Sequence, residues 1–287
     1  DLARRTSAAL HQRKITEVRL GYDASLFAGP AWNPYWPDGY GDQVSRVSAL
    51  WVNEGRGGTS VGPRSANPAK QAATEFARAL KKRGVSVSSV ESARAPESAT
   101  KVATVTSWPL QRIVEQILMT SDNDAAEVML RQAAIGAGRR GTTANGVAVV
   151  RAQLIKLGAW HEASNIADGS GLARQTRIPA DTLARLLRLA AGKEHPELRP
   201  LITGLPVAGV EGSLRVRFFD DASLAGRGIV RAKTGTLRRV HSLAGVVRTA
   251  DGSLLSFAFL VNNPKNEYAA NVWLDRVTTA ISRCGCR

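Results

Sequence analysis

The period at which apolar residues recur changes along this chain, and that change limits the fold more than any other feature. Between residues 107 and 192 apolar residues recur every three or four positions, which predicts amphipathic helices. Three later segments, residues 228–237, 241–249 and 253–263, alternate like strands, and the DGS between the last two suits a hairpin turn. Helices followed by consecutive strands predict an α+β fold, with an antiparallel sheet flanked by helices, rather than alternating βαβ units.

The first hundred residues differ from this pattern and predict a smaller mixed unit. Residues 17–27, 85–90 and 101–107 alternate like short strands, whereas residues 67–84 have the spacing of an amphipathic helix. We therefore expect short strands and at least one helix before the main α+β layers begin.

The triplet SDN lies where one predicted helix stops and the next begins. Ser107 is placed to cap the first helix, with Pro109 in its first turn, where a missing N–H costs nothing. The apolar stripe ends just before Ser121, and DAAEVMLRQAA resumes as a second helix with Asp124 and Glu127 spaced as a capping box. The triplet is therefore expected on a short connection between two helices.

The chain has 287 residues, of which 44% are hydrophobic, enough to bury the core of one large domain or two modest ones. Its formal net charge of +15 favours contact with polyanions such as nucleic acid, anionic lipid or acidic wall polymers. The basic residues are scattered and no aromatic-basic motif accompanies them, so a solvated arginine-rich surface is the simpler interpretation and no nucleic-acid partner is expected. The longest apolar stretch, LLSFAFLV, is far shorter than the roughly 20 residues that span a bilayer.

The two cysteines, Cys284 and Cys286, stand together in the terminal CGC. One Cys-x-Cys supplies too few ligands for a structural zinc site, and no histidine is nearby in the sequence. In an oxidising compartment the pair can form a tight disulfide. No metal and no nucleotide cofactor is implied by the sequence.

The triplet KTG near the C-terminus does not fit a phosphate-binding loop. Such a loop needs Gly-x4-Gly-Lys-Ser/Thr before a helix, whereas here Ala232 precedes the lysine and a strand-like segment follows. On an edge strand, Lys233 would attract a substrate carboxylate and Thr234 would hydrogen-bond to it. Gly235 would allow close approach, and the N–H of Thr236 could face a developing oxyanion. Taken alone, KTG is better explained as an ordinary surface lysine before a turn.

The triplet SDN is a weaker signal by itself, because Ser-x-Asn occurs by chance in many loops and caps. On a connection between helices, Ser121 could relay a proton and Asn123 could orient a lysine or a substrate amide. Neither residue is a nucleophile in this interpretation; both would assist one held opposite them.

The order of several blocks makes the resemblance specific. SDN with AAE, then DGSGLAR, LPVAGVEGSLRVRF, and RAKTGTL with HSLAGVV resemble the class C penicillin-binding proteins, the serine D-Ala-D-Ala carboxypeptidases and endopeptidases of bacterial peptidoglycan. The match covers about residues 101–263, while LGYDASLFAGP and VSALWVNEGR resemble the domain that this family inserts into its catalytic fold. The resemblance implies that residues 1–100 are part of an accessory domain and residues 101–287 a penicillin-binding transpeptidase-like domain that lacks its N-terminal segment.

The same resemblance implies roles for individual residues. Ser121 and Asn123 correspond to the second active-site motif of the family. Lys233, Thr234 and Gly235 correspond to the third, and Arg174 ends a loop that borders the substrate pocket in relatives. An active serine would be acylated by a D-Ala-D-Ala stem peptide, or by a β-lactam acting as a covalent inhibitor.

The first motif, Ser-x-x-Lys, has one candidate, Ser98 with Lys101. Such a pair must open a helix, because i, i+3 spacing then puts both side chains on one face and free N–H groups can bind the oxyanion. The residues that follow, VATVTSWP, alternate like a strand, on which the two side chains would point apart. Relatives also place this motif before the inserted domain. Ser98 is therefore not expected to be the nucleophile.

The expectation is then a C-terminal part of a longer exported protein of the bacterial cell envelope, with the nucleophile on a missing N-terminal segment. The lysine of the Ser-x-x-Lys motif on that segment would be the general base, and Lys233 and Asn123 would shift its pKa. Two alternatives stay open. One is a catalytically inactive peptidoglycan-binding protein, and the other is a class A-like β-lactamase, although Glu162 and Asp168 lie in no recognisable deacylating motif.

Overall fold

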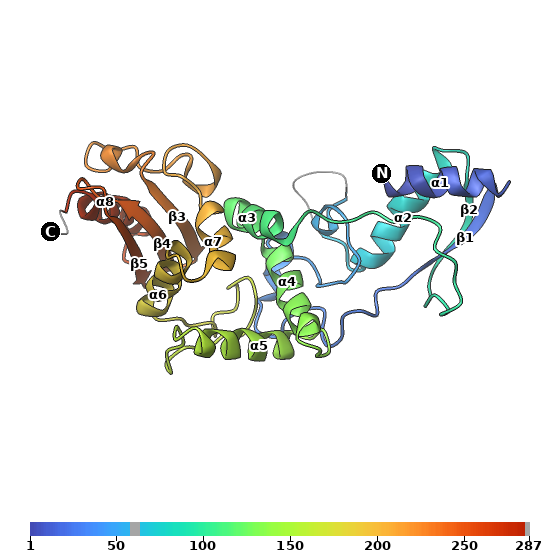
Figure 1. The fold of residues 1–287 in the computed structure, drawn as a ribbon, viewed down its shortest axis with the longest axis horizontal. Coiled ribbons are helices and arrows are strands. Elements are labelled where there is room, and N and C mark those ends of the chain that lie inside the picture. Colours follow the sequence, from blue (N-terminus) through green and yellow to red (C-terminus); the bar gives the residue numbers. More distant parts are fainter. Residues whose placement is uncertain (58–63, 285–287) are drawn as a thin grey trace. The chain divides into compact units, whose positions relative to one another are not determined.

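The structure is a computed structural model, and it describes residues 1–57 and 64–284. The chain forms two compact units (Figure 1), which we describe separately. The first unit comprises Asp1–Ser107, Asn123–Val150 and Ala167–Arg174; the second comprises Trp108–Asp122, Arg151–Ile166 and Gln175–Arg287. The expected division at residue 100 into an accessory and a transpeptidase-like domain stays a prediction, since these units are defined by compactness alone.

The first unit combines helices with one pair of strands. Its elements are α1 (Leu2–Gln12), β1 (Glu17–Tyr22), η1 (Asp38–Asp42), η2 (Asn53–Gly55), α2 (Pro68–Lys81), β2 (Ser86–Ser92), α4 (Asn123–Gly136) and the first part of α5 (Thr143–Lys156). β1 and β2 pair in parallel. The two strands pack with α1 and α2 around a core formed by Ala3 and Leu10 of α1 with Leu80 and Val85. The expected strands at 17–27 and 85–90 and the helix at 67–84 are thus confirmed, with shifted ends.

The second unit is built on a three-stranded antiparallel sheet in the order β3-β4-β5. Its strands are β3 (Val230–Leu237), β4 (Val240–Arg248) and β5 (Leu254–Asn262). Its helices are α3 (Leu110–Thr120), α6 (Ala180–Ala191), η3 (Pro196–Leu198), α7 (Pro200–Thr203), η4 (Gly212–Leu214), η5 (Leu224–Gly226) and α8 (Glu267–Ser282). The predicted α+β class and the antiparallel sheet are confirmed.

Helices cover both faces of this sheet (Figure 1). The central strand β4 therefore has buried side chains on each side. Leu243 and Val247 of β4 pack in one cluster with Leu274 of α8. Val246, one residue before Val247 and so on the opposite face, packs with Leu187 of α6. The sheet is therefore held between α8 on one side and α6 with α7 on the other.

Two expectations about residues 97–109 are wrong. Residues 101–107 form no strand, and Ser98 lies in an exposed turn in which the N–H of Ala99 donates to the carbonyl of Pro96 (2.9 Å). α3 begins at Leu110, with Pro109 at the N-cap position instead of Ser107. Trp108 precedes a proline, which disfavours helical backbone, so the helix starts after it. Ser98 still fails the requirement for the nucleophile, since it opens no helix.

Three further observations concern the described part of the chain. No helix within residues 1–57 and 64–284 is long and apolar enough to cross a bilayer. The same residues contain no group of three or more His, Cys, Asp or Glu that could hold a metal ion. Cys284 is exposed, while Cys286, the other half of the expected disulfide, lies outside the described residues.

Candidate active site

The KTG lysine and the SDN serine meet in the second unit, although 112 positions separate them in sequence. The Lys233 ammonium donates to the Ser121 Oγ (2.7 Å) and to the carbonyl of Thr234 (2.7 Å). Ser121 ends α3 in the left-handed conformation (φ 58°), and its side chain is exposed. Burial lowers the pKa of Lys233 to about 8. The lysine is thus a polarised donor whose proton is held less tightly than in water.

The register of the sheet explains where Lys233 lies. β3 is an edge strand, in which Ala232 faces the buried core and Lys233 therefore faces the other side. Across the ladder, Gly245 pairs with Ala232, and a Cβ at Gly245 would lie 2.0 Å from the carbonyl oxygen of Arg231. The glycine in β4 is therefore needed for the close approach of the strand that carries the KTG triplet.

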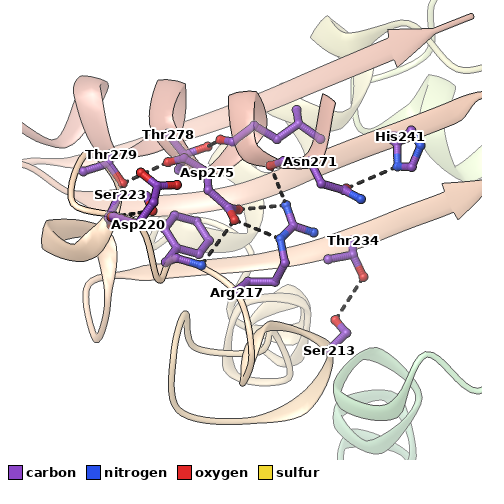
Figure 2. A network of polar contacts seen from close by, with 12 residues as sticks. Ser213, Arg217, Asp220, Ser223, Thr234, His241, Asn271, Asp275, Thr278 and Thr279 are labelled. Atoms are coloured by element: carbon purple, nitrogen blue, oxygen red, sulfur yellow. Dashed lines mark hydrogen bonds and ion pairs between the residues drawn. The ribbon is translucent and has the colours of Figure 1, made fainter. Parts of the chain in front are cut away.

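A second hydroxyl pair lies beside the first. Thr234 Oγ1 donates to the Oγ of Ser213 on η4 (3.0 Å), as Figure 2 shows. Gly212, just before Ser213, has φ +57°, and a Cβ there would lie 2.6 Å from the carbonyl oxygen of Met119 in α3. The Ser213 loop therefore packs closely on the helix that ends at Ser121. Ser213 is not among the predicted site residues, although its block GVEGSL is one of those that carry the resemblance.

An ion pair fixes the end of the same loop to α8 (Figure 2). The Arg217 guanidinium donates twice to Asp275, through Nε to Oδ2 (2.9 Å) and Nη2 to Oδ1 (2.7 Å). The N–H of Phe218 also donates to Asp275 Oδ2 (3.2 Å). Asp275 is buried, so these bonds replace its lost hydration. The loop from Gly212 to Phe218 is thus attached at one end to α3 and at the other to α8.

Gly235 of the predicted third motif and the next residue, Thr236, lie further along β3. A Cβ on Gly235 would lie 2.3 Å from Ser242 Oγ on β4, so the missing side chain makes room for a neighbouring hydroxyl. Thr236 is exposed and pairs with His241, which is buried. The His241 Nδ1 lies 3.2 Å from Asn271 Oδ1 and its Nε2 lies 3.5 Å from Glu267 Oε2. The far end of β3 is thus backed by polar groups of α8.

Two predicted site residues belong to the first unit instead. Asn123 opens α4, and its amide donates to the carbonyl of Gln43 (3.1 Å). Arg174 is exposed at the end of the DGSGLAR loop. The structure therefore brings Ser121 and Lys233 together, while the roles of Asn123 and Arg174 stay predictions.

The DGSGLAR loop is attached to α4 through the buried side chain of Glu127. Glu127 Oε1 accepts from the N–H of Gly169 (2.8 Å), the N–H of Ser170 (2.7 Å) and the Ser170 Oγ (2.7 Å). Burial, with the nearby charge of Asp168, raises the pKa of Glu127 to about 7. Three donors nevertheless converge on one oxygen, so Glu127 is the main acceptor that positions this loop.

Asp168 and Asp124 are the other buried carboxylates of this network. Asp168 accepts from the Trp36 Nε1 (3.0 Å) and the N–H of Ala173 (2.6 Å). Asp124 accepts from the N–H of Ser45 (2.7 Å) and pairs with Arg64. The capping box expected of Asp124 and Glu127 is therefore wrong. α4 already begins at Asn123, and both carboxylates find donors from distant segments of the unit.

Comparisons with known proteins place this geometry in context. Residues 52–279 match the model of the D-Ala-D-Ala carboxypeptidase 3 (S13) family. The chain is 35% identical over 279 residues to a carboxypeptidase of Mycobacterium tuberculosis and 34% identical over 280 residues to the carboxypeptidase DacB of Mycolicibacterium smegmatis. These alignments cover 95% of this chain and 59% of each relative, so the chain spans about three fifths of their length.

The fold has solved counterparts. Penicillin binding protein 4 from Haemophilus influenzae superposes with a TM-score of 0.79 and 20% identity, over 99% of this chain and 79% of that one. The same protein complexed with a β-lactam superposes with a TM-score of 0.71. The penicillin-binding fold inferred from the sequence is thus confirmed. Because the family model covers most of its residues, this chain belongs to the D-Ala-D-Ala carboxypeptidase 3 (S13) family.

Proposed function

We propose that this chain is part of a serine D-alanyl-D-alanine carboxypeptidase and endopeptidase that acts on peptidoglycan stem peptides, with its nucleophile on a segment outside these 287 residues. The observation that carries the proposal is the 2.7 Å contact of the Lys233 ammonium with Ser121 Oγ on the edge strand. Two relatives of more than 30% identity bear the name carboxypeptidase, which supports the same reaction class.

The reaction follows from these groups. A serine oxygen attacks the carbonyl of the penultimate D-Ala, the C–N bond breaks, the terminal D-Ala leaves with a proton, and water then hydrolyses the ester. Ser121 is positioned to pass that proton, since the Lys233 ammonium donates to its oxygen and can reprotonate it. With a pKa of about 8, Lys233 stays mostly cationic at neutral pH and attracts the terminal carboxylate of the substrate.

The remaining predicted residues complete the site in this proposal. Thr234 binds the substrate carboxylate, and Gly235 keeps the strand open to close approach. The N–H of Thr236 contributes to the oxyanion site. Asn123 orients the lysine of the Ser-x-x-Lys motif, and Arg174 borders the substrate pocket. No step needs a metal or a nucleotide.

The sheet offers a place for the further segment of the same protein that this proposal invokes. Within the described residues β5 pairs only with β4, so its outer edge is open to another strand. Leu254 and Leu260 of this strand are exposed, as are Tyr268 and Trp273 of α8. An apolar edge of this kind supports the docking of a further segment, with the nucleophile following it.

We also propose a location in the bacterial cell envelope, outside the cytoplasm, where peptidoglycan is found. The net charge of +15 would then hold the protein near anionic wall polymers. Retention on isolated cell walls should fall as salt is raised, since exposed charges are screened beyond about 8 Å at physiological ionic strength. Retention that does not change with salt would contradict this role of the charge.

Labelling with a fluorescent penicillin tests the proposed reaction, with the longer natural chain beside the 287-residue chain. We expect the longer chain to be acylated and the shorter one to stay dark. In the longer chain, Lys233→Ala should lower turnover of a D-Ala-D-Ala peptide at least about 100-fold, because it removes a preorganised cation from the reacting centre. Unchanged turnover would remove Lys233 from the site.

The same experiment separates the alternatives. A longer chain that binds peptidoglycan but never labels would indicate an inactive binding protein. A chain that turns over the penicillin rapidly would indicate a β-lactamase. Labelling of the short chain that Ser98→Ala abolishes would show that Ser98 is the nucleophile after all.

A further inference from the structure

A cavity of about 390 Å³ lies wholly within the first unit, at the N-terminus of α2. Arginine and small apolar residues make up much of its wall, and no Asp or Glu is among the described residues that line it. Its lining includes Arg46, Arg131, Phe27, Ala69 and Ala49. A concave site with a few converging polar groups on a mostly apolar wall is the usual form of a small-ligand site.

Arg131 is the most unusual group in this wall, because it is a buried cation. Its side chain donates through Nη1 to the carbonyl of Ala28 (3.2 Å) and through Nη2 to the carbonyl of Pro30 (2.5 Å). Its Nε is buried and has no hydrogen-bond partner, and the residue is only 3% exposed. Arg131 also forms no ion pair within the described residues; its guanidinium lies over the ring of Phe27 instead.

This arrangement leaves a positive charge without a full counter-charge. Burial lowers the pKa of Arg131, and the nearby Glu127 opposes that change. Glu127 itself has a pKa raised to about 7, so at neutral pH it is ionised only about half of the time. Buried charges are normally paired, and an unpaired donor costs free energy that a bound anion would recover.

Two further features of the cavity wall are also electrically positive. The α2 helix begins at Pro68, and the N–H of Ala69, at its second position, has no partner inside the helix. The first turn carries no acidic residue, so the positive end of the helix dipole is not compensated there. Arg46 is exposed, and its side chain forms no hydrogen bond or ion pair with the described residues. A buried guanidinium, an exposed one and a helix N-terminus thus line one cavity.

We propose that this cavity binds the free carboxylate of a small peptide, with the carboxylate between Arg131, Arg46 and the N-terminus of α2. The small side chains of Ala49 and Ala69 leave room for a methyl-sized group beside the carboxylate. The proposal is independent of the acyl-transfer reaction, because every residue that lines the cavity belongs to the first unit and none belongs to the KTG strand.

The test is isothermal titration calorimetry of the 287-residue chain with N-acetyl-D-alanine at pH 7. We expect saturable binding, and binding at least about tenfold weaker for N-acetyl-D-alaninamide, which has the same shape without the charge. Acetate should also bind at least about tenfold more weakly, because it lacks the apolar body of the peptide. Equal binding of the amide, or of acetate, would overturn the proposal.

Variants locate the binding site. Arg46→Ala should weaken binding about tenfold without affecting folding, since the side chain is exposed and makes no bond. Arg131→Met, which keeps the length of the side chain, should abolish binding, with circular dichroism reporting whether it folds. Arg83→Ala removes the same charge from an exposed site on the same unit and should change nothing.

The Lys233→Ala variant guards against binding in the other unit. It should bind N-acetyl-D-alanine as the unchanged chain does, because Lys233 belongs to the second unit and does not line this cavity. If Lys233→Ala abolishes binding, or if Arg46→Ala and Arg83→Ala behave alike, the cavity is not the site.

Discussion

Two loops of this protein are attached to their helices by opposite chemistry. The loop from Gly212 to Phe218, which carries Ser213, is fixed by the Arg217–Asp275 ion pair. The DGSGLAR loop is fixed by the backbone N–H groups of Gly169 and Ser170, which donate to Glu127 of α4. The first attachment joins two opposite charges. The second contains a carboxyl whose pKa is about 7.

The difference teaches that burial alone does not decide how an attachment responds to pH. Both Asp275 and Glu127 are buried, yet Asp275 is paired with the Arg217 guanidinium, whereas Glu127 accepts from neutral donors and has both Asp168 and Arg131 nearby. We therefore expect the DGSGLAR loop to change as the pH rises through about 7.

The largest effect is expected when the ion pair is broken. Asp275→Asn should lower the free energy of unfolding by about 3–5 kcal/mol, because Arg217 would keep a largely buried charge without its partner. Urea unfolding followed by circular dichroism measures this change. As a control, Asp181→Asn breaks an exposed pair with Arg185 and should cost no more than about 0.5 kcal/mol. Equal effects of the two variants would show that the buried ion pair contributes no more to the free energy of unfolding than the exposed one.

The next effect is the pH dependence that Glu127 confers. Its folded pKa is raised, so between pH 4.5 and about 7 the folded state binds more protons than the unfolded state. The contribution of Glu127 to stability should therefore be greatest below pH 4.5 and fall by up to about 3 kcal/mol as the pH rises to 7. Glu127→Gln should remove this part of the dependence, as measured by urea unfolding at several pH values.

Glu162→Gln is the matched control, because Glu162 is exposed and should leave the profile as it is. A Glu127→Gln profile that is parallel to that of the unchanged protein would contradict the raised pKa. It would also remove the contrast between the two loops.

The smallest effect on stability is expected at Ser213. Ser213→Ala removes one partly exposed hydrogen bond to Thr234 and should change the free energy of unfolding by less than about 1 kcal/mol. In the longer chain it should lower turnover several-fold, because the Thr234 hydroxyl loses the group that orients it. Ser253→Ala, in the β4–β5 turn, is the control for loss of a serine hydroxyl; unchanged turnover in both variants would exclude Ser213 from the site.

Much of the fold could be predicted because its signals are local. The alternation in β3, β4 and β5 and the helical spacing in α2 and α6 can be read from a few adjacent residues. The segment 101–107 shows the limit of this reading. It alternates like a strand, but a strand forms only with a partner, and none is present for it among the described residues.

The site was predicted less completely than the fold. Lys233 and Ser121 were found through their motifs, whereas Ser213 was missed because a serine in a loop has no distinctive spacing. The carboxylates of Asp124 and Glu127 were assigned to a local capping box, but their donors come from segments about 40 to 80 residues away. No pattern in the neighbouring sequence indicates such distant hydrogen-bond partners.

The sequence by itself determined the order of the motifs and the elements that carry them, since both depend on neighbouring residues. Only the tertiary structure decided that Lys233 donates to Ser121 and that its pKa falls to about 8. It also decided that Arg131 is buried with an Nε that has no hydrogen-bond partner among the described residues. Hydrogen bonding and desolvation depend on atoms brought close in space, and these atoms come from residues far apart in the chain.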